Sequence, residues 1–265
     1  MESLEAELDR ARDLDVADLA DSIEEIGFEC TRCGACCKAA ENADCGSEAT
    51  GADDGDARGG EGKHGREPEP DPKRNRERKP RIGTEAGPEA HAATVFPDEV
   101  RQLQDATEYD WRDVARPMPY GLNAGSDGPE GETFEWALAT DGCGDCTFYA
   151  EENGQGACTV HGDRPLICRT YPFSVTLVGT SQPMGGAVEQ AGEVRAHECE
   201  GLGREISWAD AEELARALKE RAIRELEEAI GVRENYEPAN FQSGEIAVHD
   251  SEGAKRPDGT SLEGE

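Results

Sequence analysis

The sequence predicts an α+β fold in which short strands, one hairpin among them, are flanked by helices. Apolar residues recur at three- or four-residue steps in the first 26 residues and again from Leu214 to Ile230, as they do along one face of a helix. Between these segments lie short runs rich in aromatic and β-branched residues, and Asn153-Gly154 is a strong hairpin signal. Helices are therefore expected at both ends of a strand-rich middle.

The N-terminal segment 1–27 is predicted to form two short helices. Asp15 is a suitable N-cap between them, and Gly27 is a suitable stop. We expect the apolar stripe of this segment to pack against the domain that follows. The stripe consists of Leu4, Leu8, Val16, Leu19, Ile23 and Ile26.

Residues 30–37, which we call the Cys octet, place Cys30, Cys33, Cys36 and Cys37 within one short stretch. The first three have the C-x2-C-x2-C spacing with which bacterial ferredoxins hold three irons of a 4Fe-4S cluster. Thiolates at such gaps converge when the backbone turns tightly, and Gly34 supplies the freedom for that turn. The Cys octet therefore predicts coordination of a soft metal.

Residues 41–90 are predicted to be a disordered insertion. Ile82 is their one large apolar residue, so the segment cannot bury enough surface to offset its chain entropy. Within it, the run 73–81 is basic but has no aromatic residues to stack on bases. We expect this run to be a solvated tether that contacts the protein's own acidic surface, and we expect no binding of nucleic acid.

The middle of the chain is predicted to contain short helices and strands. In the hairpin, segments 146–149 and 157–160 flank the Asn-Gly turn. This arrangement brings Cys146 and Cys158 close together, so that two ligands far apart in sequence can share one metal. The other predicted elements are a helix from Pro97, a second near Tyr109 or Asp110, and strands over 132–140, 173–178 and 187–194.

A long helix is predicted near the C-terminus. Ser207 is a good N-cap, Asp210 completes a variant of the capping box, and Gly231 is the expected end. The tail is expected to be mostly disordered, with weak pairing at 245–248. The predicted organisation is a helical segment 1–27, a Cys-cluster domain 28–205 interrupted by 41–90, a C-terminal helix 206–232 and a tail 233–265.

The composition is strongly acidic. Asp and Glu number 59 against 27 Lys and Arg, the formal net charge is −32, and hydrophobic residues make up 35% of the chain. Self-repulsion at that charge opposes compaction, but concentrated salt screens it within about 3 Å at 1 M. The composition resembles that of proteins from halophilic archaea, and we expect a salt-rich cytoplasm as the setting.

Compartment and membrane association are predicted from what the sequence lacks. No basic stretch followed by an apolar core marks a secretory signal, and no apolar run is long enough to cross a membrane. Ten cysteines without an export signal favour reduced thiols and metal binding over a disulfide framework. We therefore expect a cytoplasmic protein.

A second group of cysteines lies more than one hundred residues beyond the Cys octet, and we expect both groups to share a site. In the stretch 163–173, Asp163 is a candidate cap and Pro165 a candidate first residue of a helical turn that carries Cys168. A helix N-terminus and the charges of Arg164 and Arg169 would lower the pKa of the Cys168 thiol and favour the thiolate. The second group consists of Cys143, Cys146, Cys158, Cys168 and Cys199.

These motifs resemble the YkgJ-type cysteine-cluster family of zinc- or iron-chelating domains. The resemblance rests on CxxCGxCC at 30–37, the hairpin that begins at Cys146, RPxxCRxYPF at 164–173 and the lone cysteine followed by Glu200-Gly201. It covers residues 28–40 and about 91–205. It implies metal ligands at Cys30, Cys33, Cys36, Cys37, Cys146, Cys158, Cys168 and Cys199.

The chain departs from that family at three cysteine or histidine positions and in its insertion. Segment 41–90 is foreign to the family core, so Cys45 within it is predicted to be a free thiol. Cys143 forms an extra CxxC with Cys146 and is either a spare ligand or a bystander. His161, where the family often has Tyr, is predicted to be a packing residue and not a ligand.

The function predicted from the sequence is metal binding, with zinc or iron as the metal and a 4Fe-4S cluster as one form of it. Eight thiols match two four-ligand sites, or one cluster and one ion, and the adjacent Cys36 and Cys37 are expected to point apart and serve two centres. Two alternatives stay open: an iron-sulfur enzyme related to flagellin lysine-N-methylases, and a zinc-stapled module that binds a partner protein. No catalytic triad, paired-carboxylate pattern or Gly-rich nucleotide loop rises above the background.

Overall fold

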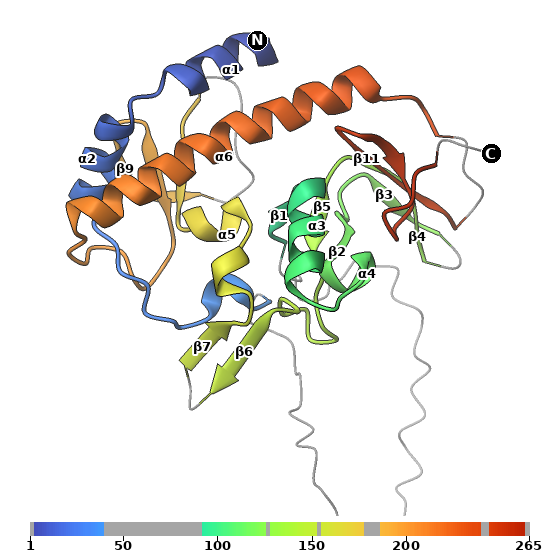
Figure 1. Cartoon of the computed structure of the whole chain (residues 1–265), viewed down its shortest axis with the longest axis horizontal. Coiled ribbons are helices and arrows are strands. Elements are labelled where there is room, and N and C mark those ends of the chain that lie inside the picture. Colours follow the sequence, from blue (N-terminus) through green and yellow to red (C-terminus); the bar gives the residue numbers. More distant parts are fainter. Residues whose placement is uncertain are drawn as a thin grey trace, which may run out of the picture.

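The computed structural model describes residues 3–39, 92–125, 128–152, 155–177, 186–239 and 244–262. The helices are α1 (Leu4–Asp13), α2 (Val16–Ile26), α3 (Pro97–Ala106), α4 (Trp111–Val114), α5 (Leu166–Thr170) and α6 (Trp208–Asn235), with 3-10 turns η1 (Ala35–Cys37) and η2 (His161–Asp163). The strands are β1 (Thr94–Val95), β2 (Ala115–Pro117), β3 (Leu122–Ala124), β4 (Pro129–Thr133), β5 (Trp136–Leu138), β6 (Tyr149–Glu152), β7 (Gln155–Cys158), β8 (Phe173–Val175), β9 (Ala187–Ala191), β10 (Val194–His197), β11 (Ile246–Asp250) and β12 (Gly253–Lys255). The fold is α+β (Figure 1).

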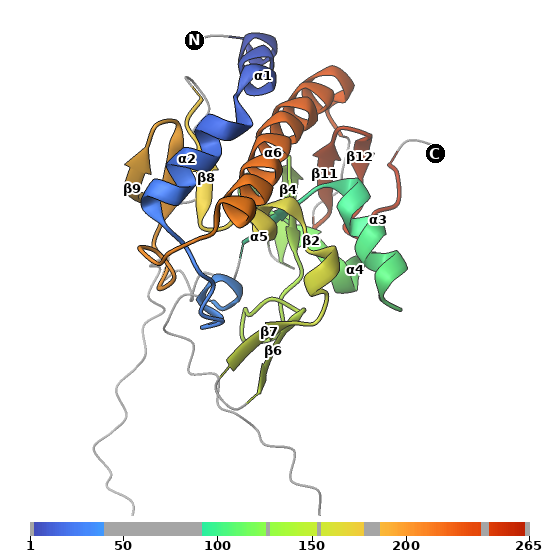
Figure 2. The same cartoon turned by 60° about the vertical axis from the view of Figure 1, so that its left-hand side comes forward.

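The two N-terminal helices form as their sequence predicts. The Asp15 side chain accepts hydrogen bonds from the backbone N–H groups of Ala17 at 2.7 Å and Asp18 at 3.3 Å, which satisfies the first donors of α2. Gly27 ends α2 with a φ of +76°, and its N–H donates to the Ile23 carbonyl at 2.8 Å. Both helices pack against α6 (Figure 2).

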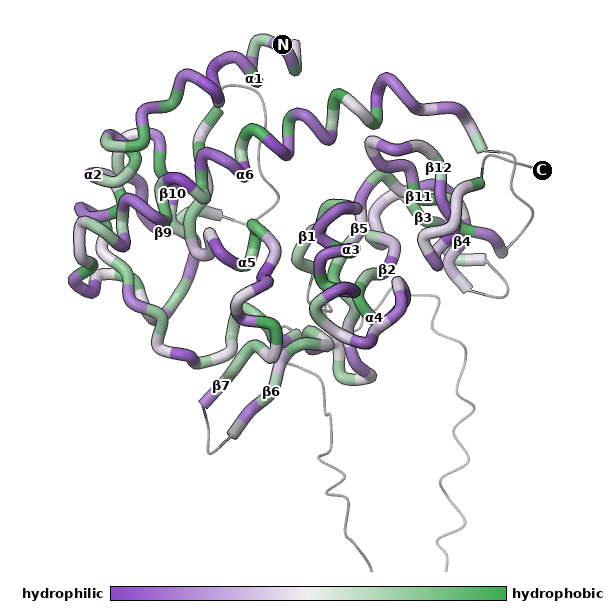
Figure 3. Tube along the Cα trace, viewed as in Figure 1, coloured by the Kyte–Doolittle hydropathy of each residue, from purple (hydrophilic) through white to green (hydrophobic). Residues whose placement is uncertain are grey.

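The long helix α6 joins two halves of the molecule. On one side it contacts α1, α2, α5 and β8, and on the other it contacts β11 (Figure 1). The predicted cap is confirmed, because the Ser207 hydroxyl accepts a hydrogen bond from Asp210 N–H at 3.2 Å. Hydrophilic and hydrophobic residues alternate along α6 (Figure 3), as expected for a helix whose faces meet different neighbours.

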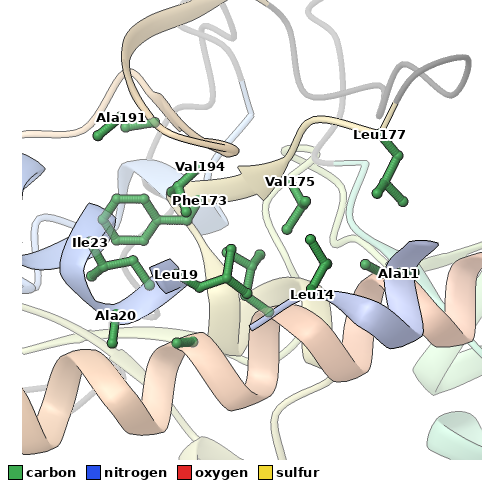
Figure 4. Close-up of a cluster of buried hydrophobic side chains, with 14 of the residues drawn as sticks. Ala11, Leu14, Leu19, Ala20, Ile23, Phe173, Val175, Leu177, Ala191 and Val194 are labelled. Atoms are coloured by element: carbon green, nitrogen blue, oxygen red, sulfur yellow. The ribbon is translucent and has the colours of Figure 1, made fainter. Parts of the chain in front are cut away.

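The first hydrophobic core lies between the N-terminal helices, α6 and the antiparallel sheet β8-β10-β9. Leu19 and Ile23 of α2 pack toward Phe173 and Val194 of the sheet (Figure 4), and all four side chains are buried. The apolar stripe of the N-terminal segment therefore packs against the domain, as predicted. This core fixes the ends of the chain segments that carry Cys168 and Cys199.

A second core lies between α3, α4 and the sheet β1-β5-β2. Trp111 and Trp136 meet edge to face with ring centroids 5.1 Å apart, and the Trp136 indole N–H donates to the buried Asp250 carboxylate at 2.9 Å. Lys255 lies 2.8 Å from the same carboxylate. The hairpin β6–β7 extends from this core, and its Phe148 and Cys146 belong to it.

The C-terminal tail is ordered over 244–262, so the expectation of a mostly disordered tail is wrong. Strand β11 pairs in parallel with β4, with Ile246 opposite Gly131, and in antiparallel with β12. The weak pairing expected at 245–248 is thus a buried strand in the four-stranded sheet β12-β11-β4-β3. Pairing with the distant strand β4 buries the side chains of β11, which its short apolar run could not achieve alone.

Two further boundaries differ from expectation. Helix α6 runs to Asn235, past the stop expected at Gly231. A Cβ at Gly231 would lie 2.6 Å from the Cβ of Ser251, so this glycine marks the close approach of the turn after β11. The strand expected over 132–140 is divided between β4 and β5. The predicted insertion 41–90 lies outside the described residues, and the domain boundaries stay a prediction.

In the part of the chain that the structure describes, no helix is both long and apolar enough to cross a membrane.

Candidate metal centre

Backbone hydrogen bonds hold the Cys octet against two distant segments. Glu29 N–H donates to the Gly201 carbonyl at 3.0 Å, beside Cys199, and Cys146 N–H donates to the Cys37 carbonyl at 2.8 Å. Gly156 N–H, in β7, donates to the Arg32 carbonyl at 2.8 Å. The chain after α2 accordingly runs to the hairpin β6–β7, beneath α5 (Figures 1 and 2).

Gly34 makes the turn that the sequence predicts for it. Its φ of +78° lies in the left-handed region, and the Cys37 N–H donates to its carbonyl at 2.8 Å, which forms η1. A Cβ at this position would lie 2.5 Å from the Tyr149 hydroxyl oxygen. The glycine is therefore required both by backbone conformation and by the contact of the Cys octet with β6.

Replacing Gly34 with alanine is expected to destabilise the octet. The left-handed conformation alone costs a residue with a Cβ about 1–2 kcal/mol, and Tyr149 must also move. Urea unfolding of the purified protein and its metal content measure the effect. Gly162→Ala is the control, because no atom lies within 4 Å of a Cβ there. Equal loss of stability in both variants would contradict the role given to Gly34.

Five cysteines from three segments line one cavity of about 290 Å³. Cys36 and Cys37 come from η1, and Cys168 from α5. Cys146 and Cys158 come from the two arms of the hairpin. The prediction that the hairpin brings Cys146 and Cys158 together is confirmed, and so is the meeting of both cysteine groups for these five thiols. We call this space the thiol cavity.

The other three predicted ligands form a separate outer group. Cys30 is exposed, whereas Cys33 and Cys199 are half-buried, and none of the three is among the residues that line the thiol cavity. Desolvation raises the pKa of Cys199, and the charges of Cys33, Cys36 and Cys30 raise it further. The thiols of the octet therefore influence Cys199 electrostatically, although none of the outer group lines the thiol cavity.

Cys36 and Cys37 do not point apart, contrary to expectation. Their sulfur atoms are 3.8 Å apart. Two thiolates bound to one tetrahedral zinc at about 2.3 Å have sulfur atoms about 3.8 Å apart, so the pair has the spacing of a shared ion.

The pKa of the Cys168 thiol is raised and not lowered, which corrects the expectation from the sequence. Desolvation by burial raises the pKa of Cys168, and the charges of Cys146, Cys36 and Cys158 raise it further. The charge of Arg164 lowers the pKa of Cys168, as expected, but desolvation and the charges of the other thiols raise it by more. The same burial raises the pKa of Cys146 to about 11. Metal binding must therefore release protons from these thiols.

Glu99 supports the turn that carries Cys168, a role that the sequence did not reveal. One Glu99 carboxylate oxygen accepts from the N–H of Leu166 at 2.8 Å, and the other from the N–H of Phe96 at 3.1 Å. Asp163 was expected to cap this turn but belongs to η2 instead. Glu99 is the third residue of the helix predicted from Pro97. A Glu at this position commonly accepts a backbone hydrogen bond at the helix start, and this position is the one sequence signal for its capping role.

The remaining residues singled out in the sequence lie away from the thiol cavity. Cys143 is disulfide-bonded, so it is no spare ligand. His161 is exposed, which corrects its expected packing role, and the charge of Arg164 lowers its pKa. Cys45 and the basic run 73–81 lie outside the described residues.

Comparison with known families concerns the region that holds the hairpin, Cys168 and Cys199. Residues 91–200 match the family model "CxxCxxCC: Putative zinc- or iron-chelating domain". This match indicates zinc or iron chelation as the function of the region. The CxxCxxCC match begins after the Cys octet, and the fold joins the octet to it through the hydrogen bonds to Cys146, Gly156 and Gly201. No curated protein and no solved structure matches the chain.

The donor set of the thiol cavity fits a soft metal. Cysteine sulfur is the ligand that zinc and iron-sulfur clusters share, and five such donors face one space. Within the described ranges, however, no three Cys, His, Asp or Glu side chains are close enough to hold a single ion. The thiols surround a volume and do not converge on a point.

Proposed function

We propose that the protein binds zinc or iron in the thiol cavity, through four of the five residues Cys36, Cys37, Cys146, Cys158 and Cys168. The observation that carries the proposal is the convergence of thiols from η1, the hairpin and α5 on one cavity. The CxxCxxCC match supports the same metals. The outer group Cys30, Cys33 and Cys199 would supply three thiols to a second centre, with Cys36 as the candidate for a fourth.

The size of the thiol cavity favours an iron-sulfur cluster over a single zinc ion. A cavity needs only about 10–15 Å³ to hold one water molecule, whereas this one has about 290 Å³. A cluster takes its four cysteines at separate iron corners, so its ligands stand farther apart than those of one ion. Apart from the close pair Cys36 and Cys37, the thiols agree with that demand, because no three lie within reach of one ion in the described part of the chain.

Arg164 would offset the negative charge of a thiolate-bound centre. Its charge lowers the pKa of Cys36, Cys158 and Cys168 against the larger effects that raise them. It also lines the thiol cavity. A bound metal supplies Lewis acidity or, as a cluster, one-electron transfer, and the chain's own contribution is to desolvate the site and to place one guanidinium beside it.

Metal analysis of anaerobically purified protein tests the proposal. We expect iron and sulfide in stoichiometric amounts with visible absorption of an iron-sulfur chromophore. Concentrated salt is used throughout because of the net charge of −32. Stoichiometric zinc in a colourless protein would keep the metal centre but refute the cluster. Protein without zinc or iron, from cells supplied with both, would refute the centre.

Cys143→Ser provides the matched control for the cysteine ligands. This residue lies three positions before Cys146, yet it is disulfide-bonded and is not among the residues that line the thiol cavity. Its replacement is expected to leave the metal content unchanged. Loss of metal in this variant would contradict the division between ligands and bystanders.

A further inference from the structure

A larger cavity of about 470 Å³ lies between α6 and the strands β1, β5 and β8. Its wall is mostly apolar and includes Val95, Val175, Ala222, Leu226 and Ala229. Ligand pockets in proteins typically have about 300–1,000 Å³, an apolar lining and a few polar groups that fix orientation. We call this space the α6 cavity and ask what its polar groups would recognise.

The charged side chains of the α6 cavity leave an excess of negative charge. Glu225 pairs with Arg221 at 2.7 Å, and Asp250 pairs with Lys255 at 2.8 Å. Glu135 and Glu228 also line the cavity; Glu228 accepts a hydrogen bond from the N–H of Ser251 at 2.8 Å, whereas Glu135 is exposed. Desolvation raises the pKa of both carboxyl groups, while the hydrogen bonds from Ser251 and the charge of Lys255 act in the opposite direction on Glu228.

Aromatic side chains stand at the same cavity. Tyr120 and Phe134 line it while remaining 64% and 46% exposed, respectively. The Phe134 ring stacks on His249 with centroids 5.4 Å apart, and the more exposed Tyr120 ring can attract a cation through its quadrupole. The apolar wall, the Glu135 carboxylate and the Tyr120 ring together match a cation that carries an apolar body.

A metal ion does not fit these observations. No three acidic, histidine or cysteine side chains in the described ranges are close enough to ligate one. A hydrated inorganic cation would also gain nothing from the apolar wall. We propose that the α6 cavity is a binding site for a small organic cation of the alkylammonium class, with its charge at Glu135 and its apolar body against α6.

The α6 cavity adjoins the thiol cavity, because Ala92 and Ile167 line both. Ile167 immediately precedes Cys168 in α5. The proposal itself rests only on the lining of the α6 cavity and holds whichever metal the thiols bind.

Calorimetric titration of the full chain in concentrated KCl tests the proposal, with n-butylammonium as probe and n-butanol as its uncharged counterpart. We expect butylammonium to bind at least about tenfold more tightly, as a charge-assisted contact implies. The high potassium concentration of the buffer excludes a site for inorganic cations. Equal affinity for the alcohol, or no heat from either probe at tens of millimolar, would overturn the proposal.

Two variants and a control locate the site. Glu135→Gln is expected to weaken butylammonium binding about tenfold, whereas Glu213→Gln, exposed on α6 away from the cavity, leaves it unchanged. Ala229→Phe fills the cavity and is expected to abolish binding while circular dichroism shows a folded chain. If Ala229→Phe does not fold, Glu135→Gln decides alone. Unchanged affinity in Glu135→Gln refutes the site.

Discussion

Replacing Cys168 with serine is expected to remove the metal from the thiol cavity. Cys168 is the thiol from α5, and among the described residues it is the one cysteine that this helix contributes to the cavity. Structural metal sites bind with about 10–16 kcal/mol, or about 3 kcal/mol for each of four ligands, so the affinity should fall about a hundredfold or more. Metal content after dialysis against a competing chelator measures the loss.

Cys199→Ser is the informative counterpart of Cys168→Ser. Cys199 belongs to the outer group and does not line the thiol cavity. We expect this variant to retain the metal of the thiol cavity and to lose only a second centre. Equal metal loss in both variants would mean that the eight thiols form one site, and full retention in Cys168→Ser would refute that ligand.

Replacing Arg221 with methionine is expected to destabilise the whole fold by about 3–5 kcal/mol. The Arg221 side chain is only 1% exposed, and its Nε donates to Glu225 at 2.7 Å. Its Nη1 donates to the Thr170 hydroxyl at 3.1 Å and to the Phe173 carbonyl at 3.3 Å. Removing the cation strands these acceptors in the interior, which costs more than the hydrophobic gain of methionine. Urea unfolding measures the change.

Arg216→Met is the control for this prediction. Arg216 pairs with Glu212 on the same helix at 2.7 Å, but its side chain is exposed, and such pairs contribute little. A change of no more than about 0.5 kcal/mol is expected there. Similar losses in the two variants would show that Arg221 acts through helix propensity and not through its contacts with α5 and β8.

The elements of the fold whose ends are set by a local sequence signal could be predicted. Asp15, Gly27 and Ser207 mark helix ends because their side chains or φ angles act within one turn. The pairing of β6 with β7 follows from the Asn153-Gly154 signal in the sequence between them. Strand β11 was expected only as weak pairing at 245–248, because its partner β4 is distant in sequence and burial, not propensity, stabilises it.

The cysteines that line the candidate site could be predicted from the sequence, but the direction of their pKa shifts could not. The spacing of the Cys octet indicated a soft metal because few other structural roles require so many thiols in so short a segment. The pKa of Cys168 was predicted in the wrong direction, since neighbouring arginines are visible in a sequence and desolvation is not. Glu99 was missed for a similar reason, because its acceptor role at Leu166 arises only when α3 and α5 meet.

The hydrogen bond between Cys146 and Cys37 has a consequence for how the chain can change during evolution. The two residues are 109 positions apart (146 − 37), so a metal held by both closes a long loop. Loop-closure entropy grows only with the logarithm of length, about 0.6 kcal/mol for each doubling. A change in the number of residues between Ala39 and Ala92 is therefore expected to cost the metal centre little.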